Sequence, residues 1–230
     1  MNFPILSSLI LLPTVGALFL FFTKSNKENN ITVKYVALFT SLVNFFLSIY
    51  LWILFDQSTS EFQFVEDRVW IEGLINYKVG IDGISILFII LTTFITPLCI
   101  ISVNNSIKNR LSEFLIAILV MESFMIGVFC SLDLVVFYLF FEAGLIPMFL
   151  IIGIWGGARR VYSAFKFFLY TLLGSVLMLV AIISIYWITG TTDVIQLYEI
   201  GIDVKYQNLL WLAFFSSFAV KTPMWPVHTW

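Results

Sequence analysis

Long apolar segments occupy most of this 230-residue chain and constrain its fold more than any other feature. By residue number they cover 4–22, 33–55, a third segment that opens at 80–85 and runs to about 103, 114–130, 133–154, about 166–188, and a last one from near 209. A helix of about 20 apolar residues crosses the ~30 Å hydrocarbon core of a bilayer. With 60% apolar and 11% charged residues, the sequence predicts an all-α polytopic membrane protein with about seven transmembrane helices.

The first apolar segment is expected to be a permanent span rather than a signal peptide. No basic stretch precedes it, its lysines follow it, and no small-residue cleavage pattern closes it. No basic patch suggests a nucleic-acid partner, and a single histidine, His228, cannot build a histidine metal site. Cys99 and Cys130 lie in apolar segments without a CxxC partner, which predicts two buried free thiols.

One long polar loop, over residues 56–80, separates the second and third spans. The patterns of residues 62–65 and 69–71 weakly predict a short β-hairpin inside it. Asp82 stands where the third span opens, so we expect it to cap that helix by accepting from free amides rather than to act in transport. Pro97 removes one backbone donor from the same span and predicts a kink.

Basic residues gather in alternate loops, which predicts the orientation of the spans. One side collects Lys24, Lys27, Lys34, Lys108, Arg110, Arg159, Arg160 and Lys166, and the other holds Arg68, Lys78 and Lys205. By the positive-inside rule the first side is cytoplasmic or matrix-facing, so the N-terminus and the 56–80 loop are expected outside. Tryptophans near the predicted span ends agree, because indole favours the interface: Trp52, Trp70, Trp155, Trp187 and Trp211.

Three ionisable residues interrupt the apolar segments: Glu122, Glu142 and Lys221. Counted at 1.5 Å per helical residue, they lie roughly 14, 14 and 18 Å from a membrane surface, near the midplane. A charge at the bilayer centre costs from about 3 kcal/mol upward, so such residues are functional-site candidates. A helical bundle can bring the three into one buried polar layer, which is the geometry that a proton relay requires.

Prolines predict a broken helix at the lysine. Pro223 and Pro226 remove amides that would bond the carbonyls of Ala219 and Thr222, so the seventh helix is expected to break at Lys221–Pro223. The freed carbonyls are expected to accept from the Lys221 ammonium. Broken helices at membrane depth are typical of transporter sites.

A second distortion is expected beside Glu142, because Pro147 frees the carbonyl of Ala143. Tyr138 lies one helical turn before Glu142 on the same face. The alternative to a relay is a structural ion pair between Glu142 and Lys221 that only positions two helices. Such a pair does not need a helix break, so the relay is favoured.

The remaining polar residues keep two interpretations each. Glu122 fits either the relay or a protonated glutamate that hydrogen-bonds a neighbouring helix. His228 fits either the relay or a packing hydrogen bond, and Lys166 fits a snorkelling contact with the interface better than a relay. The candidate site therefore consists of Glu142 and Lys221, with Glu122 and His228 as further members and no metal or cofactor ligand.

Several stretches around these residues resemble the signature sequences of a known family. They are Phe140–Met148 (FFEAGLIPM), 153–157 (GIWGG) and Phe218–Trp230 (FAVKTPMWPVHTW), with 80–85 (GIDGIS) and 164–168 (AFKFF) in agreement. In these stretches, and in order over essentially its whole length, the chain resembles subunit M, or chain 4, of proton-pumping NADH:quinone oxidoreductase, the respiratory complex I. This is a family of antiporter-like membrane subunits.

The resemblance implies a subunit of roughly fourteen helices with two inverted five-helix repeats, each containing a broken helix. It divides the chain into residues 1–103, with three N-terminal helices, and 104–230, the first part of the antiporter-like repeat. The chain stops before the second repeat and before the later lysine and glutamate of the family's proton path. It is therefore expected to be a fragment or an incomplete part of a longer subunit.

The resemblance also implies a function. The glutamate and lysine that match Glu142 and Lys221 form the first charged pair of the family's proton path, and His228 matches a histidine near the broken helix. The expected activity is proton translocation coupled to electron transfer from NADH to quinone, as a non-redox subunit of an enzyme. A charge shift from a neighbouring subunit would pull Glu142 away and release the proton of Lys221.

Cofactors, partners and location follow from the same resemblance. NADH, FMN, iron–sulfur clusters and quinone are expected on other subunits, and none in this chain. The expected partners are antiporter-like neighbours in the membrane arm and lipids. The expected location is the bacterial plasma membrane or the mitochondrial inner membrane, with the N-terminus on the periplasmic or intermembrane side. A cation/proton antiporter subunit of the multisubunit sodium/proton type is the alternative, because it resembles the same fold and uses a similar Glu and Lys.

Overall fold

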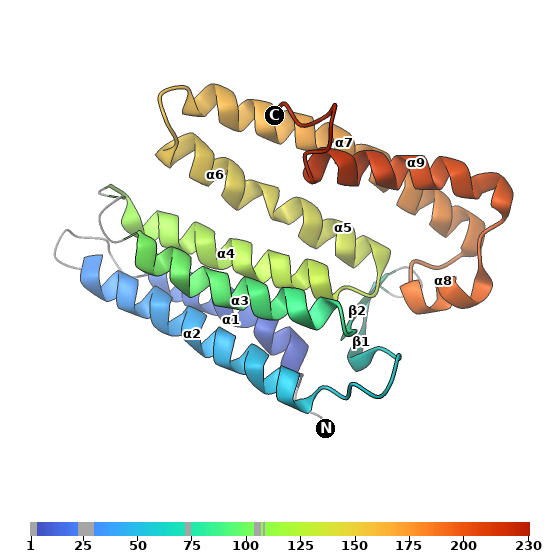
Figure 1. The fold of residues 1–230 in the computed structure, drawn as a ribbon, viewed down its shortest axis with the longest axis horizontal. Coiled ribbons are helices and arrows are strands. Elements are labelled where there is room, and N and C mark those ends of the chain that lie inside the picture. The colour runs from blue at the N-terminus through green and yellow to red at the C-terminus, as the bar shows by residue number, and fades with distance from the viewer. Residues whose placement is uncertain (1–3, 23–29, 72–74, 104–106, 108) are drawn as a thin grey trace. The chain divides into compact units, whose positions relative to one another are not determined.

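The computed structural model describes residues 4–22, 30–71, 75–103, 107 and 109–230, which fall into two compact units (Figure 1). Unit 1 comprises the chain up to Asp67 together with residues 79–131, and unit 2 comprises residues 68–78 and 132–230. Within the described residues, 6 helical segments are long and apolar enough to cross a membrane. The predicted polytopic helical membrane fold is therefore confirmed.

Unit 1 is a bundle of four helices. They are α1 (Ile5–Phe22), α2 (Asn30–Leu54), α3 (Ser85–Ser102) and α4 (Leu111–Cys130). Helix α4 packs against α1, α2 and α3, and α2 also packs against α1 and α3 (Figure 1). At the α1–α2 contact, a Cβ on Gly16 would lie 2.4 Å from Thr40 Cγ2, so only glycine allows this close approach. Helix α3 continues through Pro97, and of the two cysteines Cys130 is buried as predicted.

Cys99, by contrast, is exposed, so the prediction that both thiols are buried is wrong for this residue. It lies near the end of α3 on a helix whose apolar side chains face outward as well as inward. In a membrane protein an exposed apolar face is expected, because lipid rather than water covers it. Apolar context in the sequence therefore does not separate core from lipid-facing positions.

The polar loop between α2 and α3 contains a two-stranded sheet, β1 (Gln63–Ile71) paired with β2 (Ile75–Ile81). The weak sequence pattern predicted a hairpin but placed both of its strands inside what is the single strand β1. The carboxylate of Glu66 caps α1: it accepts from the amide of Leu6 at 2.9 Å, from the amide of Ser7 at 3.3 Å, and from the Ser7 hydroxyl. A carboxylate at a helix N-terminus satisfies free amides and complements the helix dipole.

Asp82 caps α3 as predicted, although the helix itself begins three residues later. Its Oδ1 accepts from the amides of Ile84 at 3.1 Å and Ser85 at 2.7 Å, and the Ser85 hydroxyl accepts from the Asp82 amide at 2.8 Å. Partial burial acts to raise the pKa of Asp82, but the hydrogen bonds from Ser85 and Ile84 together outweigh it and hold this pKa below its usual value.

Unit 2 holds the remaining helices. They are α5 (Leu134–Ala143), α6 (Leu145–Trp155), α7 (Arg160–Thr189), α8 (Val194–Ile200) and α9 (Val204–Lys221). Helix α7 packs against α5, α6 and α9. The sequence predicted α7 to start at 166 and missed α8, which lies inside the acidic loop predicted over 189–208. The seventh span expected from 209 corresponds to α9, which begins earlier, at Val204, and is less apolar than the other spans.

Capping aspartates organise one end of unit 2. Asp133 accepts from the amides of Val135 and Val136 at the start of α5, and also from the Thr192 hydroxyl at 2.5 Å. Asp193 caps α8 and forms an ion pair of 2.5 Å with Lys78, whose side chain is only 12% exposed. These contacts join β2, α5 and α8 at one end of the unit.

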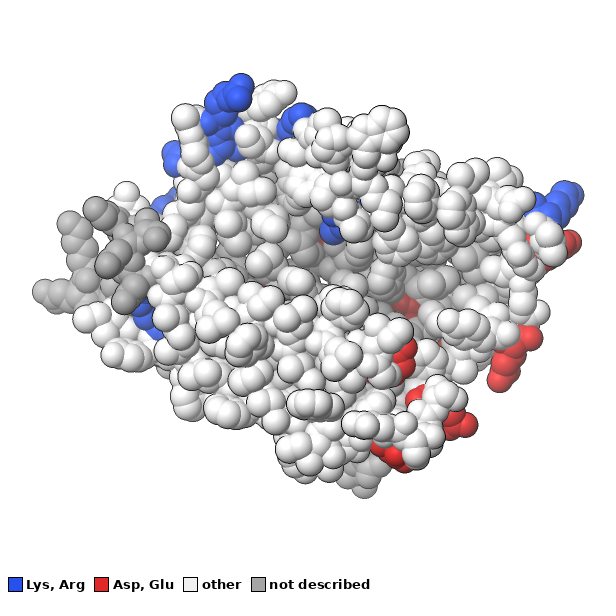
Figure 2. All heavy atoms as spheres, viewed as in Figure 1, with Lys and Arg blue, Asp and Glu red and all other residues white. Residues whose placement is uncertain are grey.

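The charged surface of unit 2 agrees in part with the predicted orientation. The face shown in Figure 2 carries few charged side chains. Basic groups gather over the α6–α7 turn, and Arg159 and Arg160 of this turn are exposed. The other end of α7 leads to Asp193 and Glu199 of the α8 region. Lys24, Lys27 and Lys108 lie outside the described residues, and which side of the membrane the N-terminus faces stays a prediction.

Candidate functional site

The helical span that carries Glu142 is distorted two residues after it. Residues 133–154 were predicted as one distorted span, and the structure divides them into α5 and α6 at Gly144. Pro147 contributes to the break because it lacks an amide and lies in the first turn of α6, where that amide is not needed. Gly144 itself keeps helical dihedral angles (φ −61°, ψ −20°), and its amide donates to the Phe140 carbonyl at 3.2 Å. Glu142 therefore sits in the last turn of α5, next to a local distortion of one helical span.

Lys221 is the last residue of α9, so the predicted break at the lysine is present in the structure. The carbonyl of Ala219 accepts from the Met224 amide at 2.8 Å, and the carbonyl of Val220 accepts from the Trp230 indole at 2.8 Å. The prediction that the carbonyls freed by the prolines bind the Lys221 ammonium is therefore wrong. Of the two freed carbonyls, that of Ala219 accepts from the segment that follows the helix, and the ammonium binds another element.

The Lys221 ammonium binds α5 instead. Its Nζ donates to the Phe141 carbonyl at 3.1 Å and lies 4.0 Å from the centroid of the Phe141 ring. A hydrogen bond from a charged donor contributes about 1.5–3 kcal/mol, and a cation–π contact adds about 0.5–2 kcal/mol. The lysine is thus held by the residue immediately before Glu142.

Glu142 and Lys221 lie close enough to interact electrostatically without touching. Both are in the described part of the chain, and no ion pair of 4.0 Å or less joins them. The Glu142 carboxylate is partly buried, and its Oε1 has no hydrogen-bond partner. The structure therefore shows a separated pair rather than the closed ion pair that a purely structural role would predict.

Two residues of α7 shape this site and were missed by the sequence analysis. Ser175 lies near the side chains of Tyr138 and Glu142, and its own hydroxyl donates to the Leu172 carbonyl at 2.9 Å. At Gly174, an added Cβ would lie 3.0 Å from the Cβ of Val220, so the small residue lets α9 approach α7 next to Lys221. The adjacent small residues in an otherwise bulky apolar span were the signal, because small residues mark close helix contacts in membranes.

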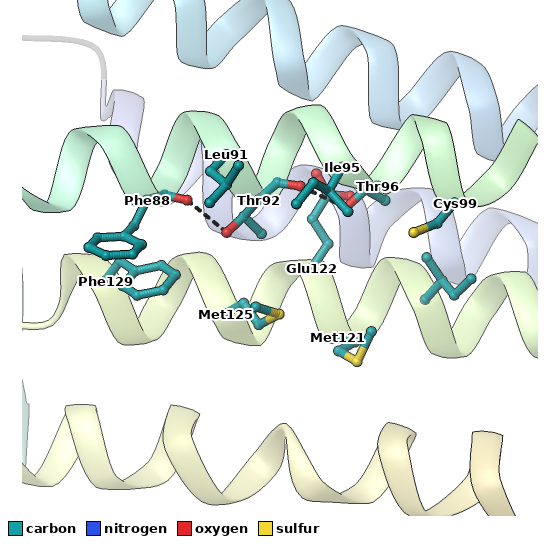
Figure 3. Close-up of a pocket in the computed structure, with 11 residues that line it drawn as sticks. Phe88, Leu91, Thr92, Ile95, Thr96, Cys99, Met121, Glu122, Met125 and Phe129 are labelled. Carbon is teal, nitrogen blue, oxygen red and sulfur yellow. Dashed lines mark hydrogen bonds between the residues drawn. The ribbon is translucent and has the colours of Figure 1, made fainter. Parts of the chain in front are cut away.

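Glu122 belongs to unit 1, so the predicted layer that joins it to Glu142 and Lys221 stays a prediction. It is 1% exposed, and Asn44 of α2 donates to its Oε1 at 2.9 Å. Glu122 also lines a cavity of 220 Å³ between α3 and α4 (Figure 3). The glutamate that hydrogen-bonds a neighbouring helix, one of the two interpretations left open, matches this geometry.

The segment after α9 folds over α7 and does not carry His228 into the site. The Trp230 ring packs on Phe167 with centroids 4.9 Å apart, and Lys166 donates to the Thr229 carbonyl. His228 itself is exposed. The Lys166 ammonium thus contacts the protein itself, whereas the sequence favoured a snorkelling contact with the membrane interface.

The fold and this site define a class: a polytopic membrane protein in which a lysine at the end of one helix lies near a glutamate at a distortion of another. Residues 131–230 match the transmembrane family described as NADH:quinone oxidoreductase/Mrp antiporter. This match, with the relatives and the solved structure described next, confirms the resemblance inferred from the motifs of the chain.

Curated relatives show which members of this family the chain is similar to. The chain is 58% identical to NADH-quinone oxidoreductase subunit M of Rhodobacter capsulatus over 210 residues, covering 86% of this chain and 41% of that protein. It is 49% identical over 227 residues to NADH-ubiquinone oxidoreductase chain 4 of Marchantia polymorpha, covering 98% of this chain and 46% of that protein. The chain therefore spans less than half the length of these relatives.

A solved structure agrees with the fold. Respiratory complex I from Thermus thermophilus with bound NADH contains a chain that superposes with a TM-score of 0.84 at 28% identity. The match covers 98% of this chain and 45% of that one. The antiporter-like fold predicted from the sequence is thereby confirmed.

Proposed function

We propose that this chain forms part of a membrane-arm subunit of NADH:quinone oxidoreductase that translocates protons, with Glu142 and Lys221 as the proton-exchanging pair. The observation that carries the proposal is the position of the Lys221 ammonium. From the end of α9 it binds the Phe141 carbonyl of α5, while the neighbouring carboxylate keeps a buried oxygen without a partner. Charged groups at membrane depth that are only partly satisfied are expected where protons move.

In the proposed mechanism the Lys221 ammonium is stabilised by Phe141 and by the Glu142 carboxylate. The distance between the ammonium and the carboxylate determines whether Lys221 keeps its proton. When the Glu142 carboxylate approaches, it stabilises the ammonium and Nζ keeps its proton. When the carboxylate retreats, only the Phe141 carbonyl and ring remain, and the proton leaves Nζ for the next acceptor. The distortion at Gly144, close to Pro147, which lacks an amide, gives the end of α5 room for this movement, and Ser175 lies near the carboxylate.

The energy for each step comes from elsewhere in the complex. Moving one charge against the membrane potential requires about 2.3 kcal/mol per 100 mV. NADH, FMN, iron–sulfur clusters and quinone would act on other subunits, and antiporter-like neighbours and lipids would flank this one in the bacterial plasma membrane or the mitochondrial inner membrane. The relatives are named as subunits of NADH dehydrogenases, so the sodium/proton antiporter alternative is less supported.

Glu122 and His228 enter the proposal as secondary members of the proton path. Glu122 has the burial expected of a relay group, but it lies in the other unit. His228 follows the broken helix and is exposed in this chain. The relay through Glu142 and Lys221 does not depend on either residue.

The test is proton pumping per NADH oxidised in membrane vesicles that contain the complete subunit with Glu142→Gln. We expect an assembled complex whose pumping and coupled quinone reduction fall at least tenfold, because the glutamine carries no negative charge that could stabilise the Lys221 ammonium as it approaches. Glu199→Gln removes a carboxylate from α8 in the same unit and serves as the matched control with normal pumping. Wild-type pumping by an assembled Glu142→Gln complex would make the pair structural and overturn the proposal.

A further inference from the structure

Three phenylalanine rings pack together where the Lys221 ammonium binds. The ammonium nitrogen lies 4.0 Å from the centroid of the Phe141 ring. The Phe137 ring, one helical turn earlier on α5, stacks on the Phe141 ring with centroids 5.6 Å apart and 24° between the ring planes. Phe218 of α9 meets the same ring edge-on, at 6.2 Å and 87°. We call these three rings, all within unit 2, the aromatic cradle.

Contacts from two helices fix the Phe141 ring in the cradle. Phe218 precedes Lys221 by three residues, so both side chains lie on the same side of α9. The rings of Phe137 and Phe218 also contact each other, with centroids 6.4 Å apart. Offset-stacked and edge-to-face arrangements are the favourable geometries for aromatic pairs. The buried Phe141 ring is therefore held in place by both α5 and α9.

Phe141 and Glu142 offer the ammonium two alternative places. Consecutive residues of a helix point about 100° apart, so the ring and the carboxylate leave α5 in different directions. The ammonium takes the first place: it donates to the Phe141 carbonyl at 3.1 Å, and no ion pair of 4.0 Å or less joins it to Glu142, although the structure describes both residues. The negative face of an aromatic ring attracts an ammonium but not a neutral amine. The ring thus competes with the carboxylate only while the lysine carries its proton.

We propose that the aromatic cradle keeps the charged pair open, with Phe141 positioning the protonated Lys221 and Phe218 holding the Phe141 ring. The inference rests on the proposed function of the Glu142 and Lys221 pair, and it concerns the regulation of that pair. Without the ring, the ammonium moves to the Glu142 carboxylate, and the closed ion pair retains the proton. After the lysine has released its proton, the ring no longer attracts it, so the side chain is free to accept the next one.

A role of the three rings in packing alone is the alternative. Such a role would explain why Phe137 and Phe218 contact Phe141 across α5 and α9. It does not explain why the ammonium lies over the face of the ring while the neighbouring carboxylate keeps a buried oxygen without a partner. The two interpretations differ in whether the electron density of the ring matters, because packing depends on shape alone.

The test replaces Phe141 in the complete subunit with phenylalanines that carry one, two or three fluorine atoms, and measures proton pumping per NADH oxidised in membrane vesicles. Fluorine withdraws electron density from the ring face while the ring nearly keeps its size, so the attraction for the ammonium weakens in steps. We expect pumping to fall with each fluorine, by about threefold with three. Phe149 on α6, which packs on Phe165 and Phe168, is the matched control and should tolerate the same replacements.

Phe218 is tested by two variants of its own. Phe218→Leu removes the edge-on ring, so we expect pumping to fall about threefold, whereas Phe218→Tyr keeps the ring and should restore normal pumping. Phe215→Leu on the same helix is the control, because Phe215 stacks on Trp211 outside the cradle. Wild-type pumping by Phe218→Leu would overturn the role of Phe218.

The position of the ammonium gives a readout that a packing role would not change. Cryo-electron microscopy of the complete complex with three fluorines on Phe141 should place Lys221 Nζ within about 3.2 Å of a Glu142 carboxylate oxygen. An ammonium that stays at the ring, or a loss of pumping that does not follow the number of fluorines, overturns the proposal. Normal pumping throughout the fluorinated series, together with collapse in Glu142→Gln, overturns the cradle alone. Failure of the proposed function is a different result, because Glu142→Gln itself would then pump normally.

Discussion

The ion pair between Lys78 and Asp193 allows a quantitative test of what joins β2 to α8 in unit 2. The two groups are 2.5 Å apart, and their side chains are only 12% and 11% exposed. Removing one partner of a buried pair typically costs 3–5 kcal/mol, because the other charge is left unpaired. With slight exposure on both sides we expect about 3 kcal/mol for Lys78→Met or Asp193→Asn.

A double-mutant cycle isolates the pair. Asn at 193 keeps an oxygen that accepts from the Ile195 amide, so the cap of α8 survives while the charge is lost. The double variant removes both charges, so it should be destabilised by less than the sum of the single variants, with a coupling of about 2 kcal/mol. Reversible unfolding of the subunit in mixed micelles with increasing dodecyl sulfate measures all four free energies.

The matched control is the pair of Arg110 and Glu113, whose side chains are 60% and 50% exposed. Exposed pairs contribute about 0–1 kcal/mol, so the cycle of Arg110→Met and Glu113→Gln should give a coupling below about 0.5 kcal/mol. Equal couplings in the two cycles would show that the burial of Lys78 and Asp193 does not strengthen their pair. That result would refute the reasoning.

Two further predictions follow from single contacts. Asp82 has a lowered pKa in the folded chain, so its stabilising effect is complete above its unfolded pKa and is lost as the pH falls through the folded pKa. The difference in unfolding free energy between wild type and Asp82→Asn should be constant above about pH 5 and shrink below about pH 4; a difference that grows on acidification contradicts this sign. Gly174→Val should push α9 away from α7 at Val220 and lower proton pumping at least threefold in an assembled complex, whereas Gly157→Ala, with no atom within 4 Å of the added Cβ, should pump normally. Normal pumping by Gly174→Val would show that this close approach does not position Lys221.

Much of the fold follows from the sequence because a bilayer leaves few options. A backbone in hydrocarbon must satisfy its own hydrogen bonds, so each apolar segment of sufficient length becomes a helix. The predicted spans and the helices α1 to α4 therefore agree closely. Asp82 could be recognised as a cap and Lys221 as the end of a helix for an equally local reason, since an Asp side chain and a proline each act on amides within a few residues.

The hairpin and helix α8 were predicted less well, because their local sequence patterns are weak. The hairpin was expected within residues 62–71, but its second strand is β2 at Ile75–Ile81. Strand pairing depends on which segments meet, and a weak alternation does not specify it. Helix α8 was missed because seven residues in an acidic loop carry little periodic signal.

The arrangement of the site was decided by tertiary structure. Sequence analysis selected Glu142 and Lys221 from their membrane depth, but the atoms that hold the ammonium belong to Phe141 on another helix. Residues 174 and 175 became part of the site only when α7 packed against α5 and α9. Depth in a membrane is a property of one helix and can be counted along the chain. Contact between helices depends on side-chain shapes that meet across 80 residues of sequence, and these are set only when the bundle packs.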